Sequence, residues 1–324
     1  MISFSSGIRH LYLSGIKDVS NDVKFGINEW LKEGKEYILS GNLPNNQFTI
    51  QVYDRLDFLR PYAFDINRLS CAAIESLNDI QKHPHSPKFN GWAITKYYYS
   101  AFFSAHSILR LTGYGIFNIE PESFKKIREL ATSYGYTYGN LNSGLYCNQI
   151  NGVDIDFKKD PRYDDSHKGL WLRFLHFITD IQTGIYAQLP QGDAQLVVDT
   201  LNSLKDALTA WGTNTGHWLS RIRNLNNYSQ DFGIWFPYKT YHKDFDNILK
   251  YKDLCKENPL AIDIASFKGR DLLYFVRACQ LINSINFDIQ KDLLTRHPIN
   301  KSFLLHGIFE YNKKYLKQDQ IIYA

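Results

Sequence analysis

The chain has 324 residues, of which 44% are hydrophobic and 22% are charged, and its formal net charge is +4. This length is enough for one large domain or two smaller ones around a sizeable core. The mild charge excludes a protein that coats nucleic acid by bulk attraction, but it is compatible with a local basic groove. Neither a leader sequence nor a run of eighteen apolar residues occurs, so we expect a protein that is neither secreted nor membrane-spanning.

The four cysteines are far apart in the sequence and form no CxxC pair: Cys71, Cys147, Cys255 and Cys279. This spacing predicts neither a zinc ribbon nor a disulfide framework, and a reducing cytoplasm fits it best. The sequence also lacks the GxxxxGK[ST] and GxGxxG phosphate loops, the HExxH zinc motif and the EF-hand pattern. We therefore expect no metal and no cofactor.

The first half of the chain carries three helical patterns. Residues 18–40 are expected to form a helix that stops at the Gly-Asn-Leu-Pro segment 41–44, and residues 65–82 show apolar side chains at helical spacing. The third pattern, 92–112, is apolar around most of its circumference. It is therefore predicted to be a buried central helix.

Residues 113–163 change character and are rich in glycine, tyrosine and asparagine. Two apolar runs, 145–150 and 153–157, flank Asn151 and Gly152, which is a strong signal for a β-hairpin. Helical patterns return at 166–189, at 194 to about 228 as one long helix, at 267–286 and at 302–316.

The end of the 194–228 helix is unusually rich in polar groups. At about 100° per residue, one narrow face collects His217, Arg221, Asn224 and Tyr228, and a neighbouring face collects Arg223 and Asn227. Such a grouping indicates a binding or catalytic site, because polar groups are costly to bury unpaired. The alternative is a solvated helix face whose arginines pair with carboxylates elsewhere.

Three segments, taken in chain order, resemble the HEPN (higher eukaryotes and prokaryotes nucleotide-binding) helical proteins. Residues 97–110 are similar to the YYxxF helix of small prokaryotic members, and Ser166-His167-Lys168-Gly169 is similar to the start of their third helix. Residues 223–228 resemble the RxxxDY ending of their fourth helix, with Asn227 where aspartate is usual.

The resemblance implies a mainly α fold: a HEPN-like four-helix up-and-down core with an inserted small β-hairpin and extra N- and C-terminal helices. The expected division is an N-terminal helical extension at 1–60, the core at 61–230 with an insertion at 113–163, and a C-terminal helical extension at 231–324. The family usually dimerises, with the fourth-helix motif facing a cleft between protomers. The terminal extensions are candidates for contact with a protein partner.

Many members of that family are metal-independent ribonucleases of toxin or antiviral systems, and their motif is arginine followed four to six residues later by histidine. Here Tyr228 occupies the histidine position, and tyrosine titrates near 10 whereas histidine titrates near 6.5. His217, one turn before Arg221, is therefore the expected proton-transfer group, while Arg221 or Arg223 stabilises the phosphate in the transition state.

Two functions follow as hypotheses. The first is an RNA-acting protein, a metal-independent endoribonuclease with catalytic residues Arg221, Arg223, His217 and Tyr228. The second is a non-catalytic module that binds RNA or a nucleotide or assembles with a protein. The residues expected to contact nucleic acid are Asn224, Asn227, Trp235 and Lys239, the last two in a segment that interleaves aromatic and basic side chains. Ordinary packing with a solvated rim is the alternative for that segment.

Overall fold

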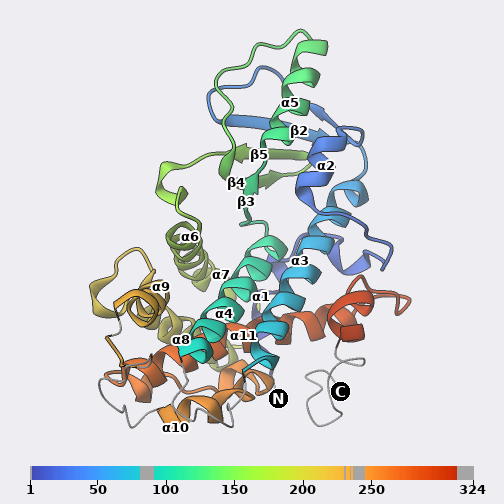
Figure 1. Cartoon of the computed structure of the whole chain (residues 1–324). Coiled ribbons are helices and arrows are strands. Elements are labelled where there is room, and N and C mark those ends of the chain that lie inside the picture. The colour runs from blue at the N-terminus through green and yellow to red at the C-terminus, as the bar shows by residue number, and fades with distance from the viewer. Residues whose placement is uncertain (1, 81–90, 230, 234, 236–244, 312–324) are drawn as a thin grey trace.

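The computed structural model describes residues 2–80, 91–229, 231–233, 235 and 245–311. Figure 1 shows a β-sheet with helices α2 and α5 at the top of the view and the other helices below it. The helical majority agrees with the sequence prediction, but the sheet is larger than the predicted hairpin.

The strands form one antiparallel sheet in the order β1-β2-β5-β4-β3 within the described part of the chain. They are β1 (Tyr37–Leu39), β2 (Gln47–Val52), β3 (Ile116–Ile119), β4 (Gly144–Asn151) and β5 (Asp154–Lys158). The predicted hairpin is confirmed as β4 and β5, and Gly152 at its turn has a φ of 68°, a conformation that favours glycine. Phe48 of β2 lies opposite Phe157 of β5, and their rings stack with centroids 4.9 Å apart.

Two predictions for this region are wrong. Residues 18–40 do not form one helix, because α2 (Ile27–Glu33) ends at Gly34, whose φ is 62°, and the chain then enters β1. The N-terminal 60 residues are thus not a purely helical extension, since they supply β1 and β2. The insertion 113–163 also holds more than a hairpin: it adds β3 and α5 (Pro121–Ser133).

The helical body is centred on α4, as the sequence predicts. Its helices are α1 (Phe4–Ile8), α3 (Arg55–Asn78), α4 (Gly91–Leu111), α6 (Ser166–Asp180), α7 (Gln182–Ile185), α8 (Gln191–Leu208), α9 (Trp218–Asn224), α10 (Phe245–Ile248) and α11 (Asp271–Thr295). Helix α4 packs against α3, α6, α9 and α11. Helix α3 begins ten residues before the predicted start, where the Asp54 carboxylate accepts a hydrogen bond from the backbone N–H of Leu56.

Helix α11 lies inside this body rather than at its edge. The pattern at 267–286 predicts a helix here, and the structure extends it to Thr295. One side of α11 carries four buried amide side chains, which we call the polar seam: Gln280, Asn283, Asn286 and Gln290. Their hydrogen bonds reach α3 and α4, so the C-terminal region contributes to the core instead of being an appended extension.

The predicted single helix 194–228 is also wrong. Left-handed backbone conformations at Trp211, Gly212 and Gly216, with φ of 56°, 71° and 73°, separate α8 from α9. Helix α9 then continues into a π-helical turn, Leu225–Ser229. Of the predicted helix 302–316, the described residues include the π-helical turn Leu305–Phe309, and the positions from 312 onward lie outside them. No described helix has the length and apolar character needed to cross a membrane.

Candidate functional site at the junction of α4, α6 and α9

A hydrogen-bonded chain of three aromatic side chains joins α4 to α6. The indole Nε1–H of Trp171 donates to the Tyr98 hydroxyl at 3.1 Å, and that hydroxyl lies 2.8 Å from Nδ1 of His167. Burial raises the pKa of Tyr98, so its hydroxyl stays protonated at neutral pH. Because an indole can only donate, the Tyr98 oxygen accepts from Trp171, while the direction of its hydrogen bond with Nδ1 is set by the tautomer of His167.

The start of α6 places His167 by local chemistry. The carboxylate of Asp165 accepts hydrogen bonds from the backbone N–H groups of His167 at 3.0 Å and Lys168 at 2.6 Å, which caps the helix. A Cβ at Gly169 would lie 2.6 Å from the carbonyl oxygen of Tyr163, so only glycine fits there. Burial, and then the positive charge of Arg223, lower the pKa of His167, which is therefore uncharged at neutral pH.

Arg223 points into the protein beside this chain. Its residue is only 6% exposed, and the centre of its guanidinium lies 4.9 Å from the Tyr98 ring centroid and 5.8 Å from that of Tyr99. Among the described residues no carboxylate approaches it within 4 Å, and its Nε–H has no hydrogen-bond partner. The aromatic faces therefore supply the main stabilisation of a buried cation.

His217 and Arg221 lie on the solvent side of the same helix. His217 is the residue just before α9, and its Nδ1 is 2.5 Å from the hydroxyl of Thr215. Partial burial lowers the pKa of His217, and the charges of Lys168 and Arg221 lower it further. The exposed Arg221 has its guanidinium 5.2 Å from the Trp211 ring centroid. The beginnings of α6 and α9 thus together present an uncharged imidazole beside two cations, with the Asp165 carboxylate also acting on it.

The remaining predicted residues of this segment separate into exposed and structural positions. Asn224 and Tyr228 are exposed, Tyr228 to 78%. The side-chain oxygen of Asn227 accepts hydrogen bonds from the hydroxyl of Thr95 at 3.0 Å and from the amide of Asn226 at 2.7 Å. Asn227 therefore ties the π-helical turn to the start of α4.

Trp235 is a packing residue in this arrangement. Its indole N–H donates to the carbonyl oxygen of Asn226 at 2.8 Å, and its ring lies 5.5 Å from that of Trp92. A Cβ at Gly91 would come within 2.5 Å of the Trp235 ring, which shows how closely α4 approaches it. Lys239, the other predicted nucleic-acid contact of this segment, lies outside the described residues.

The structure therefore brings together only part of the predicted set. Arg223 faces Tyr98 and His167, whereas His217 and Arg221 face solvent, so the two arginines do not share one side of the helix. Sequence reasoning did not select Tyr98 or His167 as site residues, although both lie in the segments that carry the family resemblance. A signal was present in the sequence: a histidine two positions after an aspartate suited to cap a helix.

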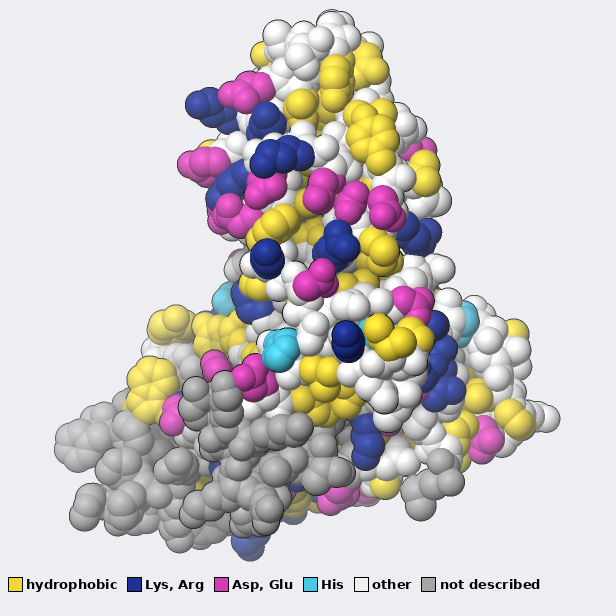
Figure 2. All heavy atoms as spheres, turned by 90° about the vertical axis from the view of Figure 1, so that its right-hand side faces the viewer, with side chains coloured by type: hydrophobic (Ala, Val, Ile, Leu, Met, Phe, Trp, Pro, Cys, Tyr) yellow, Lys and Arg dark blue, Asp and Glu magenta, His cyan; other side chains and the backbone are white. Residues whose placement is uncertain are grey.

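The distribution of charged side chains on the surface indicates which kinds of partner the protein can attract. On the face that Figure 2 shows, Lys and Arg side chains alternate with Asp and Glu side chains over the sheet end of the molecule. This mixing gives that region no single sign of charge to attract a polyanion. Within the described ranges, no three His, Cys, Asp or Glu side chains are grouped as metal ligands would be.

Comparison with known proteins identified no relative of this chain. No protein-family model matches the chain, and neither a curated protein nor a solved structure is similar to it.

Proposed function

We propose that the protein is a HEPN-like, RNA-acting protein, a metal-independent endoribonuclease whose reacting groups lie where α6 and α9 begin. One observation carries the proposal: His217, uncharged at neutral pH, lies one helical turn from the exposed Arg221 and under the electrostatic influence of Lys168. An imidazole with a pKa below its ordinary value is unprotonated at pH 7, which is the form that a general base needs.

Each group has a distinct role in this proposal. His217 accepts the proton of a ribose 2′-hydroxyl, and Arg221 and Lys168 bind the adjacent phosphate and stabilise its charge as the 2′-oxygen attacks. Arg223 is too deeply buried to meet that phosphate, so it acts as a positioning residue for Tyr98 and His167. The exposed ring of Tyr228 is available to stack on a base. We further propose, from the family resemblance, a homodimer and a toxin or antiviral setting.

The test is cleavage of total RNA and of tRNA by purified protein in the presence of a chelator. We expect His217→Ala and Arg221→Ala each to lower the rate by roughly 100-fold or more, the usual contribution of acid–base and charge-stabilising groups. His10→Ala is the matched control, since His10 is an exposed histidine whose pKa is also lowered by partial burial. Equal inertness of the wild type and both variants would eliminate the enzyme proposal.

A second candidate is a non-catalytic module that binds RNA or a nucleotide or assembles with a protein. It is favoured by Tyr228, which occupies the family's histidine position, and by His167, whose Nδ1 is already engaged by Tyr98. In this case RNA should bind without being cut. Arg221→Ala should weaken binding and reduce the slope of the logarithm of the binding constant against the logarithm of salt concentration by about one. His217→Ala should leave binding unchanged.

A further inference from the structure

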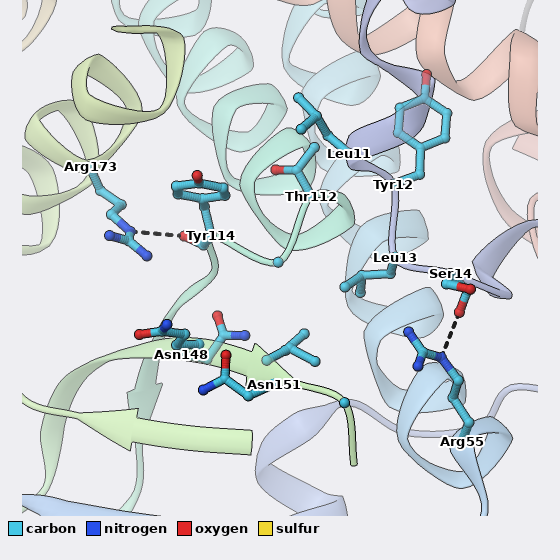
Figure 3. A pocket seen from close by; sticks show the side chains of 14 residues that line it. Leu11, Tyr12, Leu13, Ser14, Arg55, Thr112, Tyr114, Asn148, Asn151 and Arg173 are labelled. Atoms are coloured by element: carbon cyan, nitrogen blue, oxygen red, sulfur yellow. Dashed lines mark hydrogen bonds between the residues drawn. The ribbon is translucent and has the colours of Figure 1, made fainter. Parts of the chain in front are cut away.

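A separate cavity lies where the helical body meets the sheet. Its volume is about 540 Å³, and its walls come from the N-terminal segment, the start of α3, the turn after α4, strand β4 with the turn after it, and helix α6. Figure 3 shows the side chains that line it, with Leu11, Leu13 and Thr112 on the side opposite β4. Cavities of about 300–1,000 Å³ are the usual size for small-molecule sites.

Asn148 of β4 lines this cavity with an amide that has no partner. The residue is 1% exposed, and neither its Oδ1 nor its Nδ2 makes a hydrogen bond within the described structure. It lies on the same face of β4 as Tyr146 and Ile150 and opposite Phe157, so it occupies a position on a sheet face that is otherwise apolar. A buried amide without a partner is unfavourable, and a bound ligand would supply the missing hydrogen bonds.

Two arginines give the cavity a positive potential. Nε of Arg55 donates to the carbonyl oxygen of Ser14 at 2.8 Å, and Nε of Arg173 donates to that of Tyr114 at 3.3 Å. These bonds hold both guanidinium groups by one edge. The cavity lining includes no Asp or Glu, and no described carboxylate lies within 4 Å of either group. Such fixed, unpaired guanidinium groups suit phosphate oxygens.

The positions of the two groups point to the shape of the ligand. Figure 3 shows Arg173 and Arg55 at opposite ends of the lining, with Asn148 and Asn151 of β4 between them. We propose that this cavity binds an organic bisphosphate: one phosphate pairs with each arginine, and a polar middle portion hydrogen-bonds with Asn148. This site shares no residue with the proposed RNA site, so either proposal can fail without the other.

Calorimetric titration with fructose 1,6-bisphosphate, fructose 6-phosphate and fructose tests the inference. We expect the bisphosphate to bind at least tenfold more tightly than the monophosphate, and fructose not to bind. Arg55→Gln and Arg173→Gln should each remove most of that preference. Arg60→Gln is the matched control, because Arg60 is an exposed arginine of the same helix α3 that pairs with Asp57 and does not line the cavity.

A stability measurement separates a binding role for Asn148 from a structural one. Ligand-free Asn148→Leu should melt no lower than wild type, since it removes an amide without a partner, yet it should bind the bisphosphate at least tenfold more weakly. Three results would each overturn the inference: no binding, equal affinity for bisphosphate and monophosphate, or affinity unchanged by both arginine substitutions.

Discussion

The Tyr98 hydroxyl accepts a hydrogen bond from Trp171 and is hydrogen-bonded to Nδ1 of His167, so a change at this single oxygen acts on two neighbours. Tyr98→Phe leaves the indole N–H without its acceptor and should lower the free energy of unfolding by about 1–3 kcal/mol. A Tyr98 hydroxyl that donates to Nδ1 favours the uncharged form of His167, and the same substitution removes it. We therefore expect the pKa of His167 to rise, which an NMR titration of its ring protons measures.

Tyr99→Phe provides the control for that substitution. Tyr99 is the next residue on α4, is half-buried beside the same arginine, and its hydroxyl makes no hydrogen bond among the described residues. Its removal should change neither the stability by more than about 0.5 kcal/mol nor the titration of His167. An unchanged pKa of His167 in Tyr98→Phe would show that the proton is on Nδ1 instead.

Arg223 allows a second prediction at the level of one residue. Replacing a buried cation that has no carboxylate partner with an apolar side chain of similar length is often neutral or stabilising. Arg223→Met should therefore leave the free energy of unfolding unchanged or higher in urea denaturation. Because Arg223 lowers the pKa of His167, the same variant should raise that pKa toward its ordinary value. A loss of several kcal/mol would contradict this prediction and mean that the contacts of the guanidinium, including those with the Tyr98 and Tyr99 rings, outweigh its desolvation.

Burial is the property of these residues that the sequence did not reveal. Arginine and asparagine are mostly exposed in proteins, so the helical pattern placed Arg223 and Arg221 on different faces without showing which of the two is buried, and Asn148 gave no sign of its burial. Their environments depend on where α4 packs and on which face of the sheet is covered. The sequence predicted that the segment 217–228 is functionally distinctive, but not which of its side chains meet solvent.

At the scale of the element, the polar seam of α11 fixes how three helices align. Ser104 of α4 donates to Oδ1 of Asn283 at 2.8 Å, and the Asn286 amide donates to Ser70 of α3 and back to Ser104. Apolar contacts alone allow helices to slide, whereas these directional bonds form only in one register.

The seam predicts coupling between helices. Asn286→Ala should lower the free energy of unfolding by about 1–3 kcal/mol, because buried hydroxyl groups of α3 and α4 lose their donor. Combined with Ser104→Ala, it should show a coupling energy of at least about 0.5 kcal/mol in a double-mutant cycle measured by urea denaturation. The control pair Asn224→Ala and Asn202→Ala, at exposed positions of α9 and α8, should be additive. Additivity for the buried pair would contradict the role given to the seam.

Elements with a strong local signal were predicted correctly, and those that depend on distant partners were not. The apolar run of α4 and the Asn151-Gly152 turn need no information beyond their own residues. The residues of strand β1 were instead expected to be helical. That prediction failed because pairing with β2 overrides their local preference. The break between α8 and α9 was signalled by Gly212 and Gly216, but apolar periodicity on both sides concealed it.

At the scale of the whole molecule, the sheet joins segments that are about a hundred residues apart. Strand β2 pairs with β5, so the N-terminal region and the insertion between α4 and α6 form one unit. This pairing brings Phe48 against Phe157, and β5 pairs in turn with β4, which forms one wall of the cavity. Phe48→Ala should therefore destabilise the sheet by about 3–5 kcal/mol. Loss of β-sheet circular dichroism at lower urea concentration would measure this, and an unchanged midpoint would contradict it.

The same body contains several histidines whose pKa is lowered, first of all by burial: His106, His167, His176 and His217. Below pH 6.5 the unfolded chain binds protons at these positions that the folded chain does not bind. The contribution of these histidines to the free energy of unfolding should therefore be complete above about pH 6.5. Below that pH the free energy of unfolding should fall, by at most about 1.4 kcal/mol per pH unit for each group.

His106 isolates one contribution to that slope. Its Nδ1 lies 3.0 Å from Nη1 of Arg110, and the side-chain amide introduced by His106→Gln would keep an acceptor there without a titrating group. Urea denaturation at pH 7.5, 6.5 and 5.5 should give a flatter pH dependence for this variant than for wild type, because one fewer group takes up a proton on unfolding. Buried carboxyl groups such as Asp288, whose pKa is raised, act equally on both proteins and cancel in the difference. Parallel curves would mean that His106 is already accessible to protons in the folded state, and so that α4 is less tightly packed against its neighbours than its burial indicates.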